Sequence, residues 1–197
     1  GAEKTYDGTA LTADGTVTGY KNGETATFTV TGSQTAVGES ENSYTLVFDQ
    51  TAVSTDYTIS EDLGTLKVTE DKTELTIVSK TDSKEYDGTA LTAPVYTITY
   101  GEESGEATAN EDGTYSYKLS TGDVIVITPA ESATVTHVAE GTVKNAFSYT
   151  LENAEYYSNV TKTEGDLSIT VATLTVTTDG AEKTYDGTAL TADGTVT

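Results

Sequence analysis

The stretch Gly1–Thr18, GAEKTYDGTALTADGTVT, sets the organisation of this chain, because the same residues recur unchanged at Gly180–Thr197. A partial third copy, KEYDGTALTA, begins at Lys84. The two full copies define a period of 180 − 1 = 179 residues, and self-similarity at a fixed period is typical of repeat architectures. We therefore interpret the chain as one repeat unit of two modules, followed by the start of the next unit.

A Tyr-Asp-Gly motif lies at the centre of every copy. The pattern favours a structural interpretation, in which the tyrosine lies partly on a core and Asp-Gly forms a turn, because glycine tolerates a positive φ. The alternative is that the aspartates bind calcium, since acidic turns can supply hard oxygen ligands. We expect no resident cofactor, because the spaced Asp-x-Asp-x-Asp-Gly loop is missing. The motif residues are Tyr6, Asp7, Gly8, Tyr86, Asp87, Gly88, Tyr185, Asp186 and Gly187.

Alternating sequences predict an all-β protein. Leu66 and Val68 alternate with polar residues, as do Leu167 and Ile169, and a period of two is the signature of a strand with one buried face. We expect tandem Ig-like β-sandwich modules arranged end to end as an elongated rod, with β-grasp-like modules as the alternative. Further expected strands are Ala26–Thr31, Ser43–Phe48, Leu75–Lys80, Val95–Tyr100, Thr114–Leu119, Val124–Thr128, Ala133–Val138, Ala146–Leu151 and Leu174–Thr178.

The repeat also predicts module boundaries. The first module spans residues 1–70 and the second spans residues 73–171, with an extra hairpin near residues 101–115; residues 174–197 are the opening strands of the next repeat. The strand before the second full copy has no counterpart before Gly1, so we expect a chain cut from a longer array, whose first module lacks its opening strand. That strand could pair between chains, and its residues are Leu174, Thr175, Val176, Thr177 and Thr178.

The charge balance excludes several classes of function. The chain carries 32 acidic residues against 10 basic ones, a formal net charge of −22. Nucleic acid and anionic membranes require a basic surface, so neither is an expected partner, and no apolar run is long enough to insert into a membrane. Cysteine is absent and His137 is the single histidine, which leaves little for nucleophilic, metal or proton-transfer chemistry. We expect no catalytic residues, no metal site and no enzymatic activity.

Three segments together carry a resemblance to a known family. They are KTYDGTALTA from Lys4, VTGSQTAVGESENSYTL from Val30 and YTISEDLGTLKVT from Tyr57. With them the chain resembles the YDG or MBG-type Ig-like tandem repeats of bacterial, Gram-positive-like cell-surface adhesin stalks. The second module departs from the pattern, since Ser158 stands where the first has Tyr57.

The resemblance implies an extracellular protein at the bacterial cell surface, anchored to the cell wall through regions outside this sequence. The expected function is a structural stalk or spacer that projects a distal head for cell adhesion, with neighbouring repeats of the same protein as partners. Two alternatives stay open. One is a self-assembling fibre subunit completed by strand addition between copies of the chain. The other is an adhesin module that binds glycan or protein on an exposed platform of Tyr115, Tyr117, Tyr156 and Tyr157.

The resemblance to extracellular β-modules also raises the alternative of a covalent cross-link between two side chains within a module. Some of them join a lysine to an asparagine beside a buried acid. In this chain Lys84 with Asn145 or Asn153 is the conceivable pair.

Overall fold

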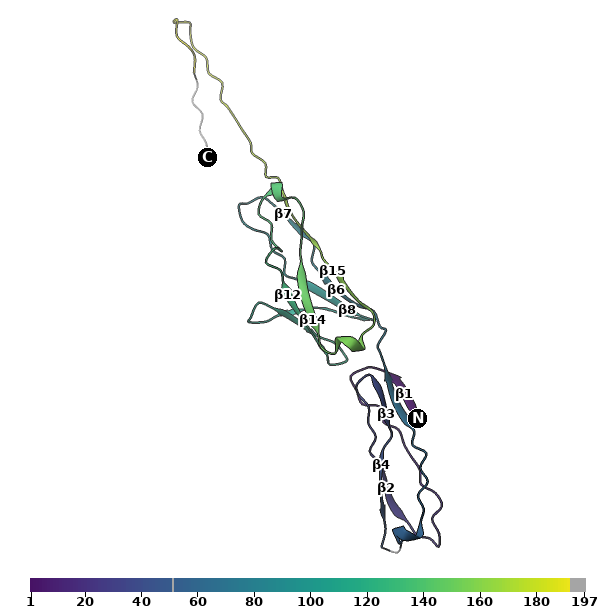
Figure 1. Ribbon diagram of the computed structural model, residues 1–197. Coiled ribbons are helices and arrows are strands. Elements are labelled where there is room, and N and C mark those ends of the chain that lie inside the picture. Colours follow the sequence, from purple (N-terminus) through teal and green to yellow (C-terminus); the bar gives the residue numbers. More distant parts are fainter. Residues whose placement is uncertain (51, 192–197) are drawn as a thin grey trace.

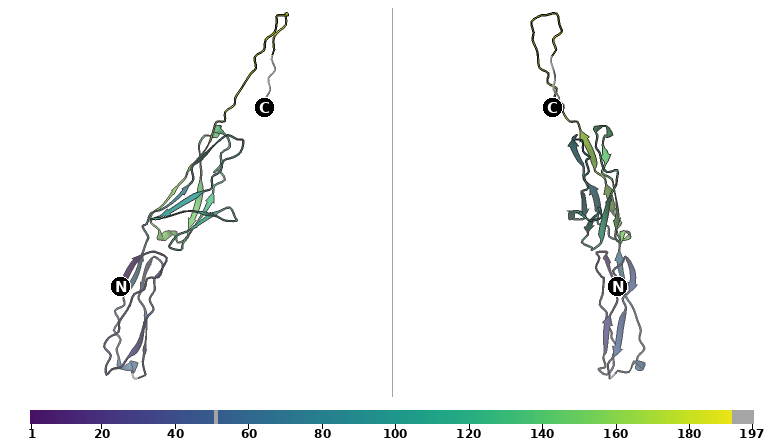
Figure 2. Two further views of the ribbon diagram at one scale, coloured as in Figure 1. Left: turned by 180° about the vertical axis from the view of Figure 1, so that it is seen from behind. Right: turned by 90° about the vertical axis from the view of Figure 1, so that its left-hand side faces the viewer.

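The protein is built from β-strands. The computed structural model describes residues 1–50 and 52–191, and in this part of the chain it contains strands and three short 3-10 helices but no α-helix. The all-β class is thereby confirmed in its coarse form. Strands of residues 1–70 pair only with one another, and so do strands of residues 75–170. Figures 1 and 2 show the two groups of strands following one another along the chain, with the segment after residue 170 leaving the far end of the second group.

The first module contains two small sheets. One has the order β1-β5-β3 and the other pairs β2 with β4. β1 and β5 run parallel, with Ala2 opposite Leu66 and Lys4 opposite Val68. The side chains of Leu66 and Val68 are buried. The strands are β1 (Ala2–Thr5), β2 (Ala26–Val30), β3 (Gly38–Glu41), β4 (Tyr44–Phe48) and β5 (Thr65–Thr69), with the 3-10 helix η1 (Ser54–Asp56) before β5.

The second module contains three sheets, ordered β15-β6-β8-β9, β13-β16-β7 and β10-β11-β12-β14. Its opening strand β6 is central, because it pairs in parallel with β15 and antiparallel with β8. The strands are β6 (Leu75–Ser79), β7 (Asp82–Glu85), β8 (Tyr96–Tyr100), β9 (Glu103–Glu106), β10 (Thr108–Ala109), β11 (Tyr115–Lys118), β12 (Val124–Pro129), β13 (Val143–Lys144), β14 (Phe147–Leu151), β15 (Val160–Thr163) and β16 (Asp166–Thr170), with η2 (Val138–Glu140) and η3 (Ala154–Tyr156).

The two modules differ in how much core they bury. In the second, β6 and β8 pack against β12 and β14, and the shared core includes the fully buried side chains of Leu75, Ile77 and Ile125. Among the described residues of the first module, the buried apolar side chains are those of Tyr6, Leu66 and Val68. The inward apolar residues of β2 and β4 stay half-exposed, and Val47 faces outward. Burial of apolar area drives folding, so the first module has less of its own to stabilise it.

Several expected strands are confirmed within a residue or two, but two are wrong. In place of a strand at Ala133–Val138 there is an isolated bridge between Val135 and Leu91, followed by η2. The Glu140 carboxylate accepts hydrogen bonds from the backbone N–H groups of Thr136 and His137. These two N–H groups are therefore not available for pairing with a neighbouring strand. Residues 174–178 form no strand, and Leu174 is 94 % exposed.

The sequence predicts one extra hairpin near residues 101–115, but the segment that follows Tyr100 contains two hairpins. β9 returns along β8 after a turn at Gly101, and β10 returns along β11 after a turn at Gly113. Both glycines have a positive φ.

Candidate functional site

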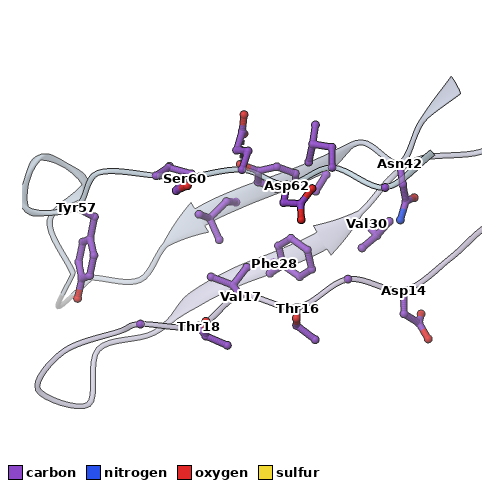
Figure 3. Close-up of a pocket in the computed structure, with 18 of the residues that line it drawn as sticks. Asp14, Thr16, Val17, Thr18, Phe28, Val30, Asn42, Tyr57, Ser60 and Asp62 are labelled. Carbon is purple, nitrogen blue, oxygen red and sulfur yellow. Dashed lines mark hydrogen bonds between the residues drawn. The ribbon is translucent and has the colours of Figure 1, made fainter. Parts of the chain in front are cut away.

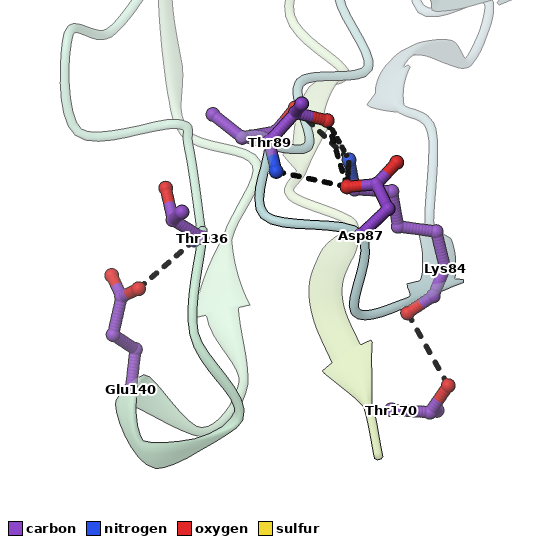
Figure 4. A network of polar contacts seen from close by, with 7 residues as sticks. Lys84, Asp87, Thr89, Thr136, Glu140 and Thr170 are labelled. Atoms are coloured by element: carbon purple, nitrogen blue, oxygen red, sulfur yellow. Dashed lines mark hydrogen bonds and ion pairs between the residues drawn. The ribbon is translucent and has the colours of Figure 1, made fainter. Parts of the chain in front are cut away.

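The Tyr-Asp-Gly motif forms a lysine-clamped turn, seen close by in Figure 4. Lys84 Nζ lies 2.8 Å from Asp87 Oδ1 and donates to Thr89 Oγ1 at 2.6 Å. The same Asp87 oxygen accepts hydrogen bonds from the backbone N–H and the hydroxyl of Thr89. Gly88 has a φ of +82°, as the turn interpretation requires. The other two copies repeat these contacts, with Lys4, Asp7 and Thr9 and with Lys183, Asp186 and Thr188.

The clamp lowers the pKa of the motif aspartates. Hydrogen bonds from Lys4 and Thr9 bring the pKa of Asp7 down to about 2, and those from Lys183 and Thr188 do the same for Asp186. A depressed carboxyl pKa contributes stability above the ordinary value of about 3.9, and this contribution is lost as the pH falls toward 2. The Asp7 side chain is 57 % exposed, so solvent screening keeps the contribution to stability small.

We expect Lys4→Gln to raise the pKa of Asp7 from about 2 toward the ordinary value of about 3.9, because the largest cause of the shift is removed. An NMR titration of the carboxyl carbons measures it directly. Asp186 in the same sample serves as the internal control and keeps its low midpoint. An unchanged Asp7 midpoint in the variant would show that the lysine is not the cause.

The three motif tyrosines have very different surroundings. Tyr6 is 6 % exposed, Tyr86 is 40 % exposed and Tyr185 is 92 % exposed. Since the motif is the same in all three, the difference comes from what lies beside each copy. Only Tyr6, among the described residues, has another module packed against it.

Tyr6 joins the first module to the base of the second. Its hydroxyl donates to Asp123 Oδ2 at 2.9 Å, and the Tyr157 hydroxyl donates to the same oxygen at 2.6 Å. Asn153 Nδ2 donates to the other carboxylate oxygen at 2.8 Å. The Tyr6 ring packs edge-on against Tyr156, with ring centroids 4.9 Å apart. Burial and the Asp123 carboxylate together raise the pKa of Tyr6 to about 12, so the Tyr6 hydroxyl keeps its proton and donates this hydrogen bond well above neutral pH.

The glycine of the motif allows the close approach. A Cβ on Gly8 would overlap the backbone carbonyl of Thr121, and Gly8 has a φ of +78°. Any other residue would separate the modules or strain the turn. We call this contact between the motif of the first module and Thr121, Asp123 and Tyr157 the junction.

The base of the first module repeats half of this arrangement. Tyr57 follows η1 as Tyr157 follows η3, and its hydroxyl donates to Glu24, which precedes β2 as Asp123 precedes β12. The expected correspondence of Ser158 with Tyr57 is therefore wrong, because Tyr157 occupies that place. A one-residue offset between the modules before β15 hid this from the sequence alignment.

A groove of about 570 Å³ opens along the first module between residues 16–20 and residues 59–62. Figure 3 shows these two segments on either side of β2 and β4, with Phe28 and Val30 between them. Leu46, which pairs with Phe28 across β2 and β4, also lines the groove. The floor is apolar, while Asp14, Glu61 and Asp62 contribute carboxylates to its border.

The other candidate residues lie elsewhere. Tyr115, Tyr117 and Tyr156 are half-buried against the core and Tyr157 is buried in it, so these rings form no exposed platform. Lys84 is held by Asp87, whereas Asn145 Nδ2 donates to the carbonyls of Lys80 and Ala93 and Asn153 pairs with Asp123. The structure thus does not bring the expected cross-link partners together.

In the described residues no group of three or more acidic or histidine side chains gathers to hold a metal ion, and calcium binding stays an untested prediction. Residues 192–197, the end of the second full copy, lie outside the described residues. The described part of the chain holds no helix of the length and apolar character needed to cross a membrane.

No family model matches the chain, and no curated protein or solved structure is similar enough to count as a match.

Proposed function

We propose that this chain is a stalk segment of a repetitive bacterial cell-surface protein, in which Ig-like β-sandwich modules are joined end to end into a semi-rigid rod. The resemblance to YDG-type repeats and the unchanged recurrence of Gly1–Thr18 support the proposal. Its task is to hold a distal head away from the cell. The high negative charge keeps neighbouring stalks apart.

The observation that carries the proposal is the junction. Tyr6 is buried where the two modules meet, and Asp123 links it to Tyr157. A buried, hydrogen-bonded contact restricts rotation between modules more than a bare linker does.

The same parts recur in positions that would continue the rod. The motif of the second module directly follows β7, and Figure 1 shows β7 at the end of that module farthest from the first module. The first module has its own pair of a tyrosine and an acid, in which the Tyr57 hydroxyl donates to Glu24. If a next unit followed the second module, the Tyr57 and Glu24 pair of its first module would meet Tyr86, as Tyr157 and Asp123 meet Tyr6. Head-to-tail contacts of this kind propagate instead of closing.

Small-angle X-ray scattering on chains of one and two units tests the proposal. A second unit is added by repeating residues 1–179. For a semi-rigid stalk we expect the maximum dimension to about double, because rigidly joined modules add their lengths. The same two-unit chain with Tyr6→Ala in both units is the control and should be shorter and broader in its distance distribution. A length that grows only as the square root of the number of units would contradict the stalk.

The cell-surface location is tested separately. Antibodies against the chain should label intact cells of the source bacterium, and protease treatment of those cells should remove the label. Labelling only after the cells are opened would contradict an extracellular stalk.

A further inference from the structure

We infer that Tyr6 and Tyr156 form a covalent dityrosine bond when the chain meets a one-electron oxidant, so that the junction becomes a cross-link between the two modules. The co-reactant is a haem peroxidase with hydrogen peroxide, or another oxidant that removes single electrons from phenols. The inference deepens the stalk proposal and rests on it for one point, that the chain meets such oxidants outside the cell.

The composition directs oxidation toward tyrosine. Cysteine and methionine are the usual targets of oxidants in proteins, and the chain has neither of them and no tryptophan. It has 13 tyrosines. An oxidant that takes one electron from this chain therefore takes it from a phenol, and the fate of the resulting radical depends on the groups beside that phenol.

Tyr6 and Tyr156 are the closest pair of tyrosine rings in the described residues. Their ring centroids are 4.9 Å apart and their planes are inclined by 62°, an edge-to-face arrangement that aromatic pairs prefer. The next closest pair, Tyr96 and Tyr115, is 5.2 Å apart and lies within the second module. Tyr6 belongs to the first module and Tyr156 to the second, so a bond between these two rings joins the modules.

Tyr6 has a base in place to take its phenolic proton. A tyrosine that loses an electron becomes a strong acid, so its oxidation is easiest where a positioned group accepts the proton. The Tyr6 hydroxyl donates to Asp123 Oδ2 at 2.9 Å. The Tyr96 hydroxyl is buried without a hydrogen-bond partner in the described part of the chain, so its oxidation would leave a proton in the core. Proton transfer thus distinguishes two tyrosine pairs of similar spacing.

Tyr156 is the point at which electrons leave this cluster. Its side chain is half-buried, whereas Tyr6 is 6 % exposed. An oxidant therefore reaches Tyr156 first. An electron then passes from Tyr6 to Tyr156 across the ring contact, because the Tyr6 proton can move to Asp123 at the same time. A second oxidation of Tyr156 places two phenoxyl radicals side by side, and the oxidant never has to enter the junction.

Coupling of the two radicals conserves atoms and electrons. Each tyrosine gives one electron to the oxidant and one phenolic proton, which goes to Asp123 from Tyr6 and to water from Tyr156. A carbon–carbon bond forms between the ring carbons beside the two hydroxyl groups, and the hydrogen on each of these carbons moves to its own phenol oxygen. Asp123 then releases its proton to water. One hydrogen peroxide takes up the two electrons and two protons and becomes two water molecules.

Tyr157 is a poorer partner for Tyr6, although its ring also lies nearby. The centroids of these two rings are 5.9 Å apart and their planes are inclined by 86°. The Tyr157 hydroxyl is held between Asp123 and Thr121, and its side chain is 6 % exposed, so the ring has little room to turn. The half-buried Tyr156 can rotate toward Tyr6 until the two reacting carbons meet.

The bond changes how the junction fails. Without it, Tyr6 leaves the second module when the first module unfolds or swings away. With it, residues 6 and 156 stay joined, and the two modules keep their contact under bending or pulling. A cross-link between residues so far apart in the sequence also reduces the conformational freedom of the unfolded chain. Oxidation would therefore stiffen this part of a stalk.

Mass spectrometry of the oxidised chain tests the inference. The full chain is treated at low concentration with a haem peroxidase and hydrogen peroxide, and in parallel with a photoactivated ruthenium complex and persulfate, which is small enough to reach half-buried rings. The monomer is then isolated and cleaved after lysine. We expect residues 5–21 to be linked to residues 145–162, with a mass equal to the sum of the two peptides less two hydrogens. Fragmentation should place the link at Tyr6 and Tyr156.

Substitutions identify the partners and the proton acceptor. Tyr6→Phe and Tyr156→Phe keep the ring but lack the phenol, so each should abolish this linked pair of peptides. Tyr86→Phe is the matched control in the second copy of the motif and should leave the yield unchanged. Asp123→Asn should lower the yield by about tenfold or more, because a positioned proton acceptor contributes at least that factor to proton transfer. Asp123→Glu restores a carboxylate and should recover part of the yield. Near-ultraviolet circular dichroism checks that each variant is folded.

Three results would overturn the inference. The first is the absence of the linked peptides with both oxidants. The second is their persistence in the Tyr6→Phe or the Tyr156→Phe chain. The third is an equal yield of a link between Tyr96 and Tyr115, which would show that spacing alone decides the coupling. The stalk proposal is judged separately, by X-ray scattering of chains that have not been oxidised, so either proposal can fail without the other.

Discussion

Leu75→Ala is expected to lower the free energy of unfolding of the second module by about 2–5 kcal/mol. Leu75 is fully buried in β6, between β15 and β8 and against the core side chains of β12 and β14. Truncation would remove its apolar contacts and leave a cavity in a sheet that cannot collapse easily. Urea unfolding followed by near-ultraviolet circular dichroism, where the tyrosines of the core report, measures the loss.

The repeat supplies a matched control for this substitution. Leu174 is the same residue at the same place in the next copy, but it is 94 % exposed. In dilute solution Leu174→Ala should change the stability by no more than about 0.5 kcal/mol. Equal losses for the two variants would mean that residues 174–178 are already buried in the isolated chain.

Tyr6→Ala is expected to have the second large effect, a loss of about 3–5 kcal/mol from the coupled first module and junction. Tyr6 is one of few buried apolar residues in the first module, and its ring packs against Tyr156 while its hydroxyl bonds to Asp123. The first module should therefore unfold at lower urea and turn more freely against the second. Urea unfolding gives the first quantity, and residual dipolar couplings give the second.

The two other copies of the motif are the controls for Tyr6. Tyr185→Ala should leave stability unchanged, because the side chain is 92 % exposed, and Tyr86→Ala should have a smaller effect than Tyr6→Ala. Tyr6→Phe isolates the hydrogen bond to Asp123, which as a bond to a charged group is worth about 1.5–3 kcal/mol. If all three alanine variants behaved alike, the motif would act within its own turn and not at a junction.

The strands were predictable wherever burial alternates locally. Alternation with polar residues predicts one buried face at Leu66 and Val68 and again at Leu167 and Ile169. All four side chains are buried. The same reasoning failed at Ala133–Val138, where the carboxylate of Glu140 closes a turn that alternation cannot reveal. It also missed β1 and β7, because these short strands exist through parallel pairing with β5 and β16, more than sixty residues away.

Only one side of the candidate site, the Tyr-Asp-Gly motif, could be predicted from the sequence. The Tyr-Asp-Gly copies stood out through repetition, and so did Leu174–Thr178 as a strand that opens the next unit. The residues that contact Tyr6 in the second module did not stand out in the sequence. Asp123 lies in no recognisable motif, and the hydrogen bond from Tyr6 spans 117 residues. The one available hint was Tyr157 near the end of the second module, whose match to Tyr57 was obscured by the one-residue offset.

By itself the sequence determined the β class, the repeat and the turns of the motif, because side-chain alternation and the backbone freedom of glycine act over a few neighbouring residues. Only the tertiary structure decided which motif tyrosine is buried, which strands run parallel and where a groove lies open. Those outcomes depend on contacts between residues far apart in the chain. Tyr6 and Tyr185 have identical local sequences, yet one is 6 % exposed and the other 92 %. The difference is made by the module beside Tyr6.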